Sequence, residues 1–219
     1  MDPSAPRTNT LTRKGARTRA RIVDAAARLV YERGVAGTTV EDVRAAAEVS
    51  GSQLYHYFAD KDALVQAVID CQADAIVANQ ERADLATADG LRAWRSAVLA
   101  HAERTGGAGG CPLGSLGGQL AERDTRARTH LAAGFERWAG VLRDGLRALS
   151  AAGEISRDVD PDALAVTLLA ALQGGLLLAQ VQRDSRPLET ALDTLLALAG
   201  VRPAHDLGVL GAADGAEAA

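Results

Sequence analysis

The sequence predicts an all-α protein, and three observations carry this prediction. Hydrophobic residues make up 47% of the chain and charged residues 24%, which is the composition of a globular protein. Aromatic residues contribute only 3%, so the core must consist mainly of Ala, Leu and Val, which favours packed helices over aromatic-rich strands. Apolar residues also recur at three- and four-residue spacing along much of the chain, as they do on one face of an α-helix.

A chain of 219 residues is long enough for a small domain followed by one of ordinary size. The patterns below place a helix-turn-helix domain first and a larger helical domain after it. A basic, flexible arm precedes them, and a Gly- and Ala-rich tail that we expect to be disordered follows. The expected boundaries are 1–16 for the arm, 17–65 for the first domain, 66–201 for the second and 202–219 for the tail.

The first domain begins with an amphipathic helix. From Arg17 onward, apolar residues recur at helical spacing, and Gly34 stands where a helix would stop. A second short helix follows, in which Thr39 and Asp42 have the spacing of a capping box. Only three residues, 48–50, separate it from a third helix over 51–58. Two short helices joined by so tight a turn form a helix-turn-helix unit.

The third helix divides its side chains between a core and an outer face. Leu54 and Phe58 are four residues apart and are expected to point inward. That leaves an outward set that suits a DNA major groove, where Gln pairs with adenine and Tyr or His reaches phosphate: Ser52, Gln53, Tyr55 and His56. Asp60 is placed to cap a fourth helix. Lys61 then stands in its first turn, where a cation opposes the helix dipole, so a phosphate partner would explain it.

Charge is distributed unevenly along the chain. The net charge is −4, yet residues 1–65 hold ten Lys and Arg against eight Asp and Glu, whereas residues 66–219 hold fourteen against twenty. Six basic residues and no acidic one lie between Arg7 and Val23: Arg7, Arg13, Lys14, Arg17, Arg19 and Arg21. Such a run is typical of local nucleic-acid contact, but a solvated, disordered tail would have the same composition.

The stretch from Arg19 to Leu64, above all TTVEDV, AAEVS and LYHYFADKDAL, closely resembles the DNA-binding domain of the tetracycline-repressor (TetR/AcrR) family. The resemblance implies that Thr39, Ser50, Tyr55 and Lys61 hold the DNA backbone, with Ser52, Gln53 and His56 nearest the bases. Two positions depart from the family pattern. Glu48 replaces a turn glycine, which implies either left-handed strain of about 1 kcal/mol or a slightly different turn. Arg44 replaces a small residue, so the second helix is expected to sit a little differently.

Beyond Leu64 the helical pattern continues to about Leu85. A glycine-rich segment, 105–118, must begin as a loop, and it lacks the Gly-Lys-Ser/Thr ending of a phosphate-binding loop. Further helices are expected over 89–104, 124–152, 160–181 and 187–199, with Gly153 ending the longest of them. The segments GCPLGSL and LLAALQGGLLLAQ resemble the carboxy-terminal domain of one TetR branch, which implies an effector pocket over 89–152 and a homodimer formed by the last two helices.

The effector-pocket prediction rests on a set of seven residues: Trp94, Val98, Cys111, Leu116, Phe135, Trp138 and Gln173. The aromatic members suit either a pocket wall or an ordinary core. Gln173 lies in an apolar helix, where a buried amide needs partners from an effector, another subunit or the backbone. Cys111, near a possible helix start, is either a reactive thiol that senses oxidants or electrophiles or a small buried hydrophobe. The low aromatic content hints at a ligand bound by aliphatic contacts.

Other functional classes find little support. The four His and two Cys have no metal-ligand spacing, and no nucleophile elbow, carboxylate pair or dinucleotide fingerprint is present, so we expect no metal, cofactor or catalytic residue. A helical adaptor and an enzyme without a recognisable motif remain as alternatives to a DNA-binding regulator. The polar amino terminus resembles no secretory signal, which predicts a cytoplasmic protein. The apolar run 163–181 approaches membrane-spanning length, but Gln173 and two adjacent glycines favour a buried interface helix.

Members of the family usually repress transcription, so the resemblance implies repression rather than activation.

Overall fold

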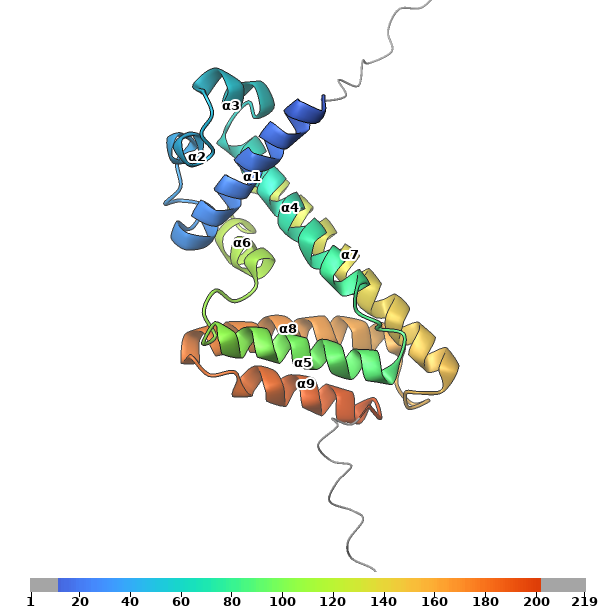
Figure 1. The fold of residues 1–219 in the computed structure, drawn as a ribbon. Helices are drawn as coiled ribbons and strands as arrows, with labels where there is room; N and C mark the ends of the chain where they lie inside the picture. The colour runs from blue at the N-terminus through green and yellow to red at the C-terminus, as the bar shows by residue number, and fades with distance from the viewer. Residues whose placement is uncertain (1–11, 202–219) are drawn as a thin grey trace, which may run out of the picture. The chain divides into compact units, whose positions relative to one another are not determined.

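The computed structural model describes residues 12–201, and the secondary structure within this range is helical. The chain divides into two compact units, with the division after Cys71. The helices of both units are labelled in Figure 1. The predicted all-α fold, with a helix-turn-helix domain first and a larger helical domain second, is confirmed.

The amino-terminal unit contains three helices and the start of a fourth: α1 (Arg13–Arg33), α2 (Val40–Ala46), α3 (Gly51–Tyr57) and α4 (Lys61–Glu81). Its small core is formed by apolar side chains from all four, including Ile22, Leu29, Val43, Leu54 and Leu64. α1 begins four residues before the expected start of the domain at residue 17. The reason is local, because the Thr12 hydroxyl accepts a hydrogen bond from the Gly15 amide and so caps the helix at this earlier point.

The carboxy-terminal unit holds the rest of α4 and five further helices: α5 (Ala88–Arg104), α6 (Pro112–Leu120), α7 (Thr125–Ala152), α8 (Pro161–Gln182) and α9 (Arg186–Leu198). α8 packs against α7 and α9, and α9 also lies against α5 (Figure 1). Gly153 ends α7 in the left-handed conformation, with φ of 74°, as its sequence position predicted. The tail that was predicted to be disordered, 202–219, and most of the flexible arm predicted over 1–16 lie outside the described residues.

α6 is the one described helix that the sequence patterns did not set out as an element. Its segment contains three glycines, which disfavour an α-helix, so the sequence pattern did not indicate one. The helix starts because Pro112 occupies its first turn and the Cys111 Sγ accepts a hydrogen bond from the Gly114 amide at 3.3 Å.

α8 is apolar enough, with a mean hydropathy of 1.9, and long enough to cross a membrane. A core helix of a folded domain can have the same composition. In this structure α8 buries one side against α7 and α9 and leaves its other side exposed, with Val166, Leu177 and Val181 each more than half exposed.

Candidate DNA-binding surface and effector region

The start of α2 is fixed by a reciprocal pair of hydrogen bonds. The Thr39 hydroxyl oxygen accepts from the Asp42 amide at 3.1 Å, and Asp42 Oδ2 accepts from the Thr39 amide at 2.9 Å. This is the capping box that the sequence predicted. The hydrogen bonds from Thr39 hold the pKa of the Asp42 carboxyl below its usual range. Thr39 therefore already has a structural role, and its predicted DNA contact would be made by a residue held firmly in place.

The two departures noted in the sequence lie on α2, which holds Arg44, and in the turn after it, which holds Glu48. Glu48 has φ of 51°, so the left-handed strain predicted for a non-glycine residue here is present. Arg44 links α2 to this turn. Its guanidinium pairs with Glu41, and its Nη1 donates to the Val49 carbonyl at 3.4 Å.

The start of α3 repeats the capping arrangement. The Ser50 hydroxyl accepts from the Gln53 amide at 3.2 Å, while Gln53 Oε1 accepts from the Ser50 amide at 2.9 Å. Leu54 and Phe58 are buried, as predicted. The four residues predicted to face outward are exposed together: Ser52, Gln53, Tyr55 and His56. The structure thus gathers these polar and aromatic side chains on one exposed face of a short, doubly capped helix.

The cap changes what Gln53 can do at a base edge. A bidentate contact with adenine uses both the oxygen and the nitrogen of the amide. Because Gln53 Oε1 is already bonded to the Ser50 amide, the side chain reaches a base either by breaking that bond or through Nε2 alone. Sequence reasoning placed Gln53 on the outer face but did not foresee this competition.

Lys61 is half-buried, and its Nζ donates to the Val35 carbonyl at 2.7 Å. The two residues are 26 positions apart, so this bond ties the start of α4 to the loop after α1. It supplies a second explanation for a cation in the first turn of α4, besides the predicted phosphate. Asp60 caps the helix as expected, since its Oδ1 accepts from the Ala63 amide at 2.7 Å.

The basic run at the start of the chain lies on a helix from Arg13 onward. Arg7 lies outside the described residues, but the other five members are exposed on α1: Arg13, Lys14, Arg17, Arg19 and Arg21. Arg19 stacks over the Phe58 ring, with 5.2 Å between its Cζ and the ring centroid. This contact between α1 and the end of α3 had no signal in the local sequence.

The seven predicted effector-pocket residues come from four helices of the carboxy-terminal unit. Trp94 and Val98 lie on α5, Cys111 and Leu116 at and within α6, Phe135 and Trp138 on α7, and Gln173 on α8. Trp94 Nε1 donates to Gln80 Oε1 at 2.6 Å, and the Phe135 and Trp138 rings stack with 6.4 Å between centroids. Cys111 is buried. None of the seven lines the open hollow between α8 and α9.

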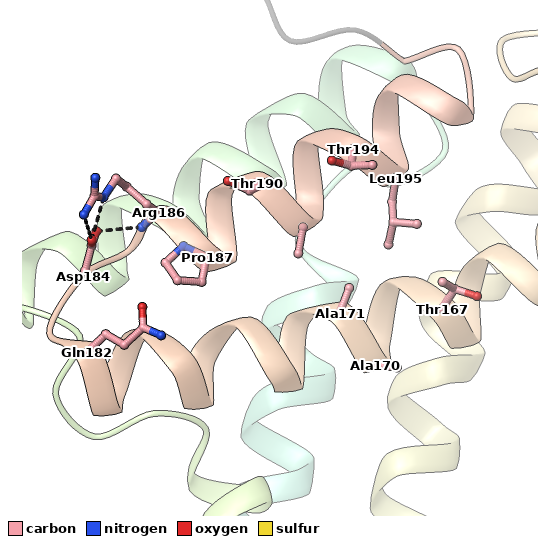
Figure 2. Close-up of a pocket in the computed structure, with 11 residues that line it drawn as sticks. Thr167, Ala170, Ala171, Gln182, Asp184, Arg186, Pro187, Thr190, Thr194 and Leu195 are labelled. Carbon is pink, nitrogen blue, oxygen red and sulfur yellow. Dashed lines mark hydrogen bonds and ion pairs between the residues drawn. The ribbon is translucent and has the colours of Figure 1, made fainter.

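That hollow, of about 730 Å³, lies between α8 and α9 and is open (Figure 2). Its walls are mostly small or apolar side chains: Thr167, Ala170, Ala171, Pro187, Thr190, Ala191, Thr194 and Leu195, with Gln182, Asp184 and Arg186 at one end. Several large apolar residues of the same two helices are also exposed: Val166, Leu177, Leu178, Val181 and Leu198. Over the described residues, no group of three or more His, Cys, Asp or Glu could hold a metal ion.

Comparisons with known proteins match both units. The model of the tetR family of bacterial regulatory proteins matches residues 22–68, and that of the tetracyclin repressor-like C-terminal domain matches residues 87–195. The HTH-type transcriptional repressor DhaR of Mycobacterium sp. (strain GP1) is 30% identical over 178 residues, which cover 80% of this chain and 88% of DhaR. The chain belongs to the TetR family. Its members are DNA-binding transcriptional regulators, not enzymes, and the resemblance predicted from the sequence is confirmed.

Further proteins are similar to this one along most of the chain. The transcriptional regulator AcuR of Cereibacter sphaeroides is 28% identical over 163 residues, covering 73% of this chain and 74% of its own. A TetR regulator from Chloroflexus aurantiacus has a solved structure with a TM-score of 0.72 and 29% identity, covering 87% of this chain and 98% of that one. A regulatory TetR protein from Rhodobacter sphaeroides gives a TM-score of 0.73 at 26% identity, covering 83% and 98%.

Proposed function

We propose that this TetR-family chain is a cytoplasmic repressor that binds an inverted-repeat operator as a homodimer and is released from it by a small-molecule effector. The observation that carries the DNA-binding part is the outer face of α3. Four polar or aromatic side chains are exposed there, and Tyr55 is 60% exposed. A soluble domain has little reason to present a tyrosine, a histidine and a glutamine side by side to water, whereas phosphate and base edges use all three.

The proposed DNA contacts are of two kinds, as the resemblance to the family implies. Thr39, Ser50, Tyr55 and Lys61 are proposed to hold phosphates, since their hydroxyl and ammonium groups can donate hydrogen bonds to phosphate oxygens. Ser52, Gln53 and His56 are proposed to lie nearest the base edges. The exposed basic residues of α1 add positive charge to the same unit, which strengthens its attraction to the DNA backbone.

Operator binding tests this proposal against two alternatives, a helical adaptor and an enzyme without a recognisable catalytic motif. The purified chain is titrated with a duplex from the upstream region of its own gene and with a random duplex of equal length. A specific operator is expected to bind roughly 10³-fold or more tightly than random DNA at physiological salt. Equal affinity for both duplexes would contradict the proposal.

The proposed homodimer rests on the exposed apolar faces of α8 and α9. Val166, Leu177 and Val181 leave more apolar surface in water than a soluble helix of a monomer normally does. Gly174 adds to this, because a Cβ at its position would meet nothing within 4 Å, so a partner helix can approach closely there. Gly175 faces the other way, against Leu188 of α9 in the same chain. An isologous contact of two α8–α9 pairs would cover these faces.

Two recognition helices related by the two-fold axis of such a dimer should reach successive major grooves roughly 34–36 Å apart. The operator is therefore expected to be an inverted repeat. The proposed effector binds in the carboxy-terminal unit, where the seven pocket candidates lie, and no membrane partner is needed because the dimer covers the apolar side of α8.

A further inference from the structure

Arg19 of α1 stacks over the ring of Phe58 at the end of α3. Its Cζ lies 5.2 Å from the ring centroid, within the distance at which a guanidinium is attracted to a ring face. Arg19 is exposed while Phe58 is only 2% exposed, so the guanidinium covers the ring on its solvent side. Among the described residues no carboxylate pairs with Arg19, whereas Arg44 of the same unit is paired with Glu41.

Arg19 also differs from the rest of the basic run in the side of α1 on which it lies. Successive residues of an α-helix are about 100° apart, so a residue shares a face with those three, four, seven and eleven positions further on. For Arg19 these positions are all buried in the core of the amino-terminal unit: Ile22, Val23, Ala26 and Val30. Three other members of the run follow one another at four-residue spacing on a different, solvated side: Arg13, Arg17 and Arg21. Arg19 is therefore the member that lies on the core-facing side of α1 and reaches α3.

The end of α3 is also where two of the proposed phosphate contacts lie. Tyr55 stands three residues before Phe58 and Lys61 three residues after it. Tyr55 is 60% exposed, and the Nζ of Lys61 is already bonded to a backbone carbonyl. A cation held over Phe58 is thus close to both positions along this segment, and its charge is not neutralised by a neighbouring carboxylate.

Stacking leaves Arg19 ready to bind a phosphate. A ring face fixes the plane of a guanidinium but uses none of its N–H groups, so the donors at its edge stay available. Two such donors match two oxygens of one phosphate. We propose that Arg19 is a further contact with the DNA backbone, positioned by Phe58 to hold a phosphate beside the carboxy-terminal end of α3. This proposal rests on the operator-binding function proposed above.

Removing the charge of Arg19 while keeping its stem tests the phosphate contact. Arg19→Met is expected to weaken binding to operator and random duplexes alike, by roughly tenfold per subunit. The slope of log affinity against log salt should become shallower by about one unit per subunit. Arg28→Met is the matched control, because Arg28 is exposed on the opposite side of α1 and should leave the slope close to that of the parent. The proposal is wrong if Arg19→Met keeps the parent's slope or if both variants change it equally.

A purely structural role, in which Arg19 only covers the Phe58 ring, predicts a different result. Arg19→Met would then lower the melting temperature sharply and leave the salt slope unchanged, and this outcome would overturn the proposal. The proposed role predicts a fall of less than about 4 °C, because an exposed cation–π contact contributes little and a Met side chain still covers the ring. Thermal melting followed by circular dichroism measures the change and shows that the variant is folded in the binding assay.

Arg19→Lys tests the positioning by Phe58. The variant keeps the charge but loses the planar group that stacks on the ring and binds a phosphate through two parallel hydrogen bonds. Its salt slope should stay near that of the parent, while its affinity for both duplexes falls by roughly three- to tenfold. An affinity equal to the parent's would show that the stacked guanidinium is not needed.

The random duplex separates this proposal from the proposed function. Backbone contacts do not depend on base sequence, so the effect of Arg19→Met is measurable on random DNA even when no specific operator is found. A parent that prefers no duplex, with a shallower slope for Arg19→Met, would contradict the proposed function alone. A parent that prefers its operator, with Arg19→Met binding as tightly as the parent at every salt concentration, would contradict the role of Arg19 alone.

Discussion

The two units of this chain differ in whether certain polar side chains have hydrogen-bond partners. In the amino-terminal unit, Ser50 and Gln53 satisfy each other through short-range capping bonds and present their remaining polar atoms to solvent. In the carboxy-terminal unit, the side-chain N–H donors of Trp138 and Gln173 are buried and have no partner among the described residues. A surface that binds a rigid duplex binds it more tightly when its side chains are already fixed in place. A site that responds to a ligand can instead leave hydrogen-bond donors unpaired until the ligand binds and pairs them.

The largest expected effect concerns the exposed side of the carboxy-terminal unit. Leu177→Arg places a charge at the centre of the proposed dimer contact, where Leu177 is 60% exposed in the single chain. The dimer should dissociate at micromolar concentration, and operator affinity should fall roughly 100-fold or more because the two half-sites are no longer bound by one molecule. Light scattering and operator titration measure the two effects.

Ala132→Arg on α7 is the matched control for this change, since Ala132 is exposed on a helix outside the proposed contact. It should leave both the molar mass and the operator affinity unchanged. A parent protein that is monomeric at micromolar concentration would contradict the proposed dimer outright.

Lys61→Ala tests a residue with two roles in the amino-terminal unit. Loss of the bond to the Val35 carbonyl should lower the free energy of unfolding by about 1–3 kcal/mol, as expected for a hydrogen bond from a charged donor. Loss of a phosphate contact should weaken binding to every duplex and make the slope of log affinity against log salt shallower by about one unit per subunit. Urea unfolding and a salt series separate the roles: a stability loss with an unchanged salt slope would mean that Lys61 is structural only.

The smallest expected effect is a gain in stability in the turn before α3. Glu48→Gly removes the strain of a side chain on a residue with left-handed backbone conformation. It should raise the free energy of unfolding by about 1 kcal/mol. Glu48→Ala removes the same charge but keeps the Cβ, so it should not produce this gain. Equal stabilisation by both changes in urea unfolding would point to charge rather than backbone strain.

Features fixed by near neighbours in the sequence were predictable, and those that depend on distant contacts were not. The Thr39–Asp42 capping box, the helix end at Gly153 and the inward placement of Leu54 and Phe58 follow from residue type and spacing alone, and all are present. The bond from Lys61 to Val35 spans 26 residues and left no local signal. The same holds for the approach of Gln173 to Gly114, which depends on how α8 packs near a glycine-rich helix that the patterns did not delimit.

Gln53→Ala tests the central claim, that the outer face of α3 reads DNA sequence, more directly than any other change. Its affinity for the preferred operator and for a random duplex is measured across a salt series and compared with the parent. Operator affinity should fall by about 1–3 kcal/mol while affinity for random DNA stays almost constant, so that specificity is lost and the salt slope is kept. Equal losses on both duplexes would show that Gln53 supports the fold of α3 through its cap and does not read bases, and the proposed recognition surface would be wrong.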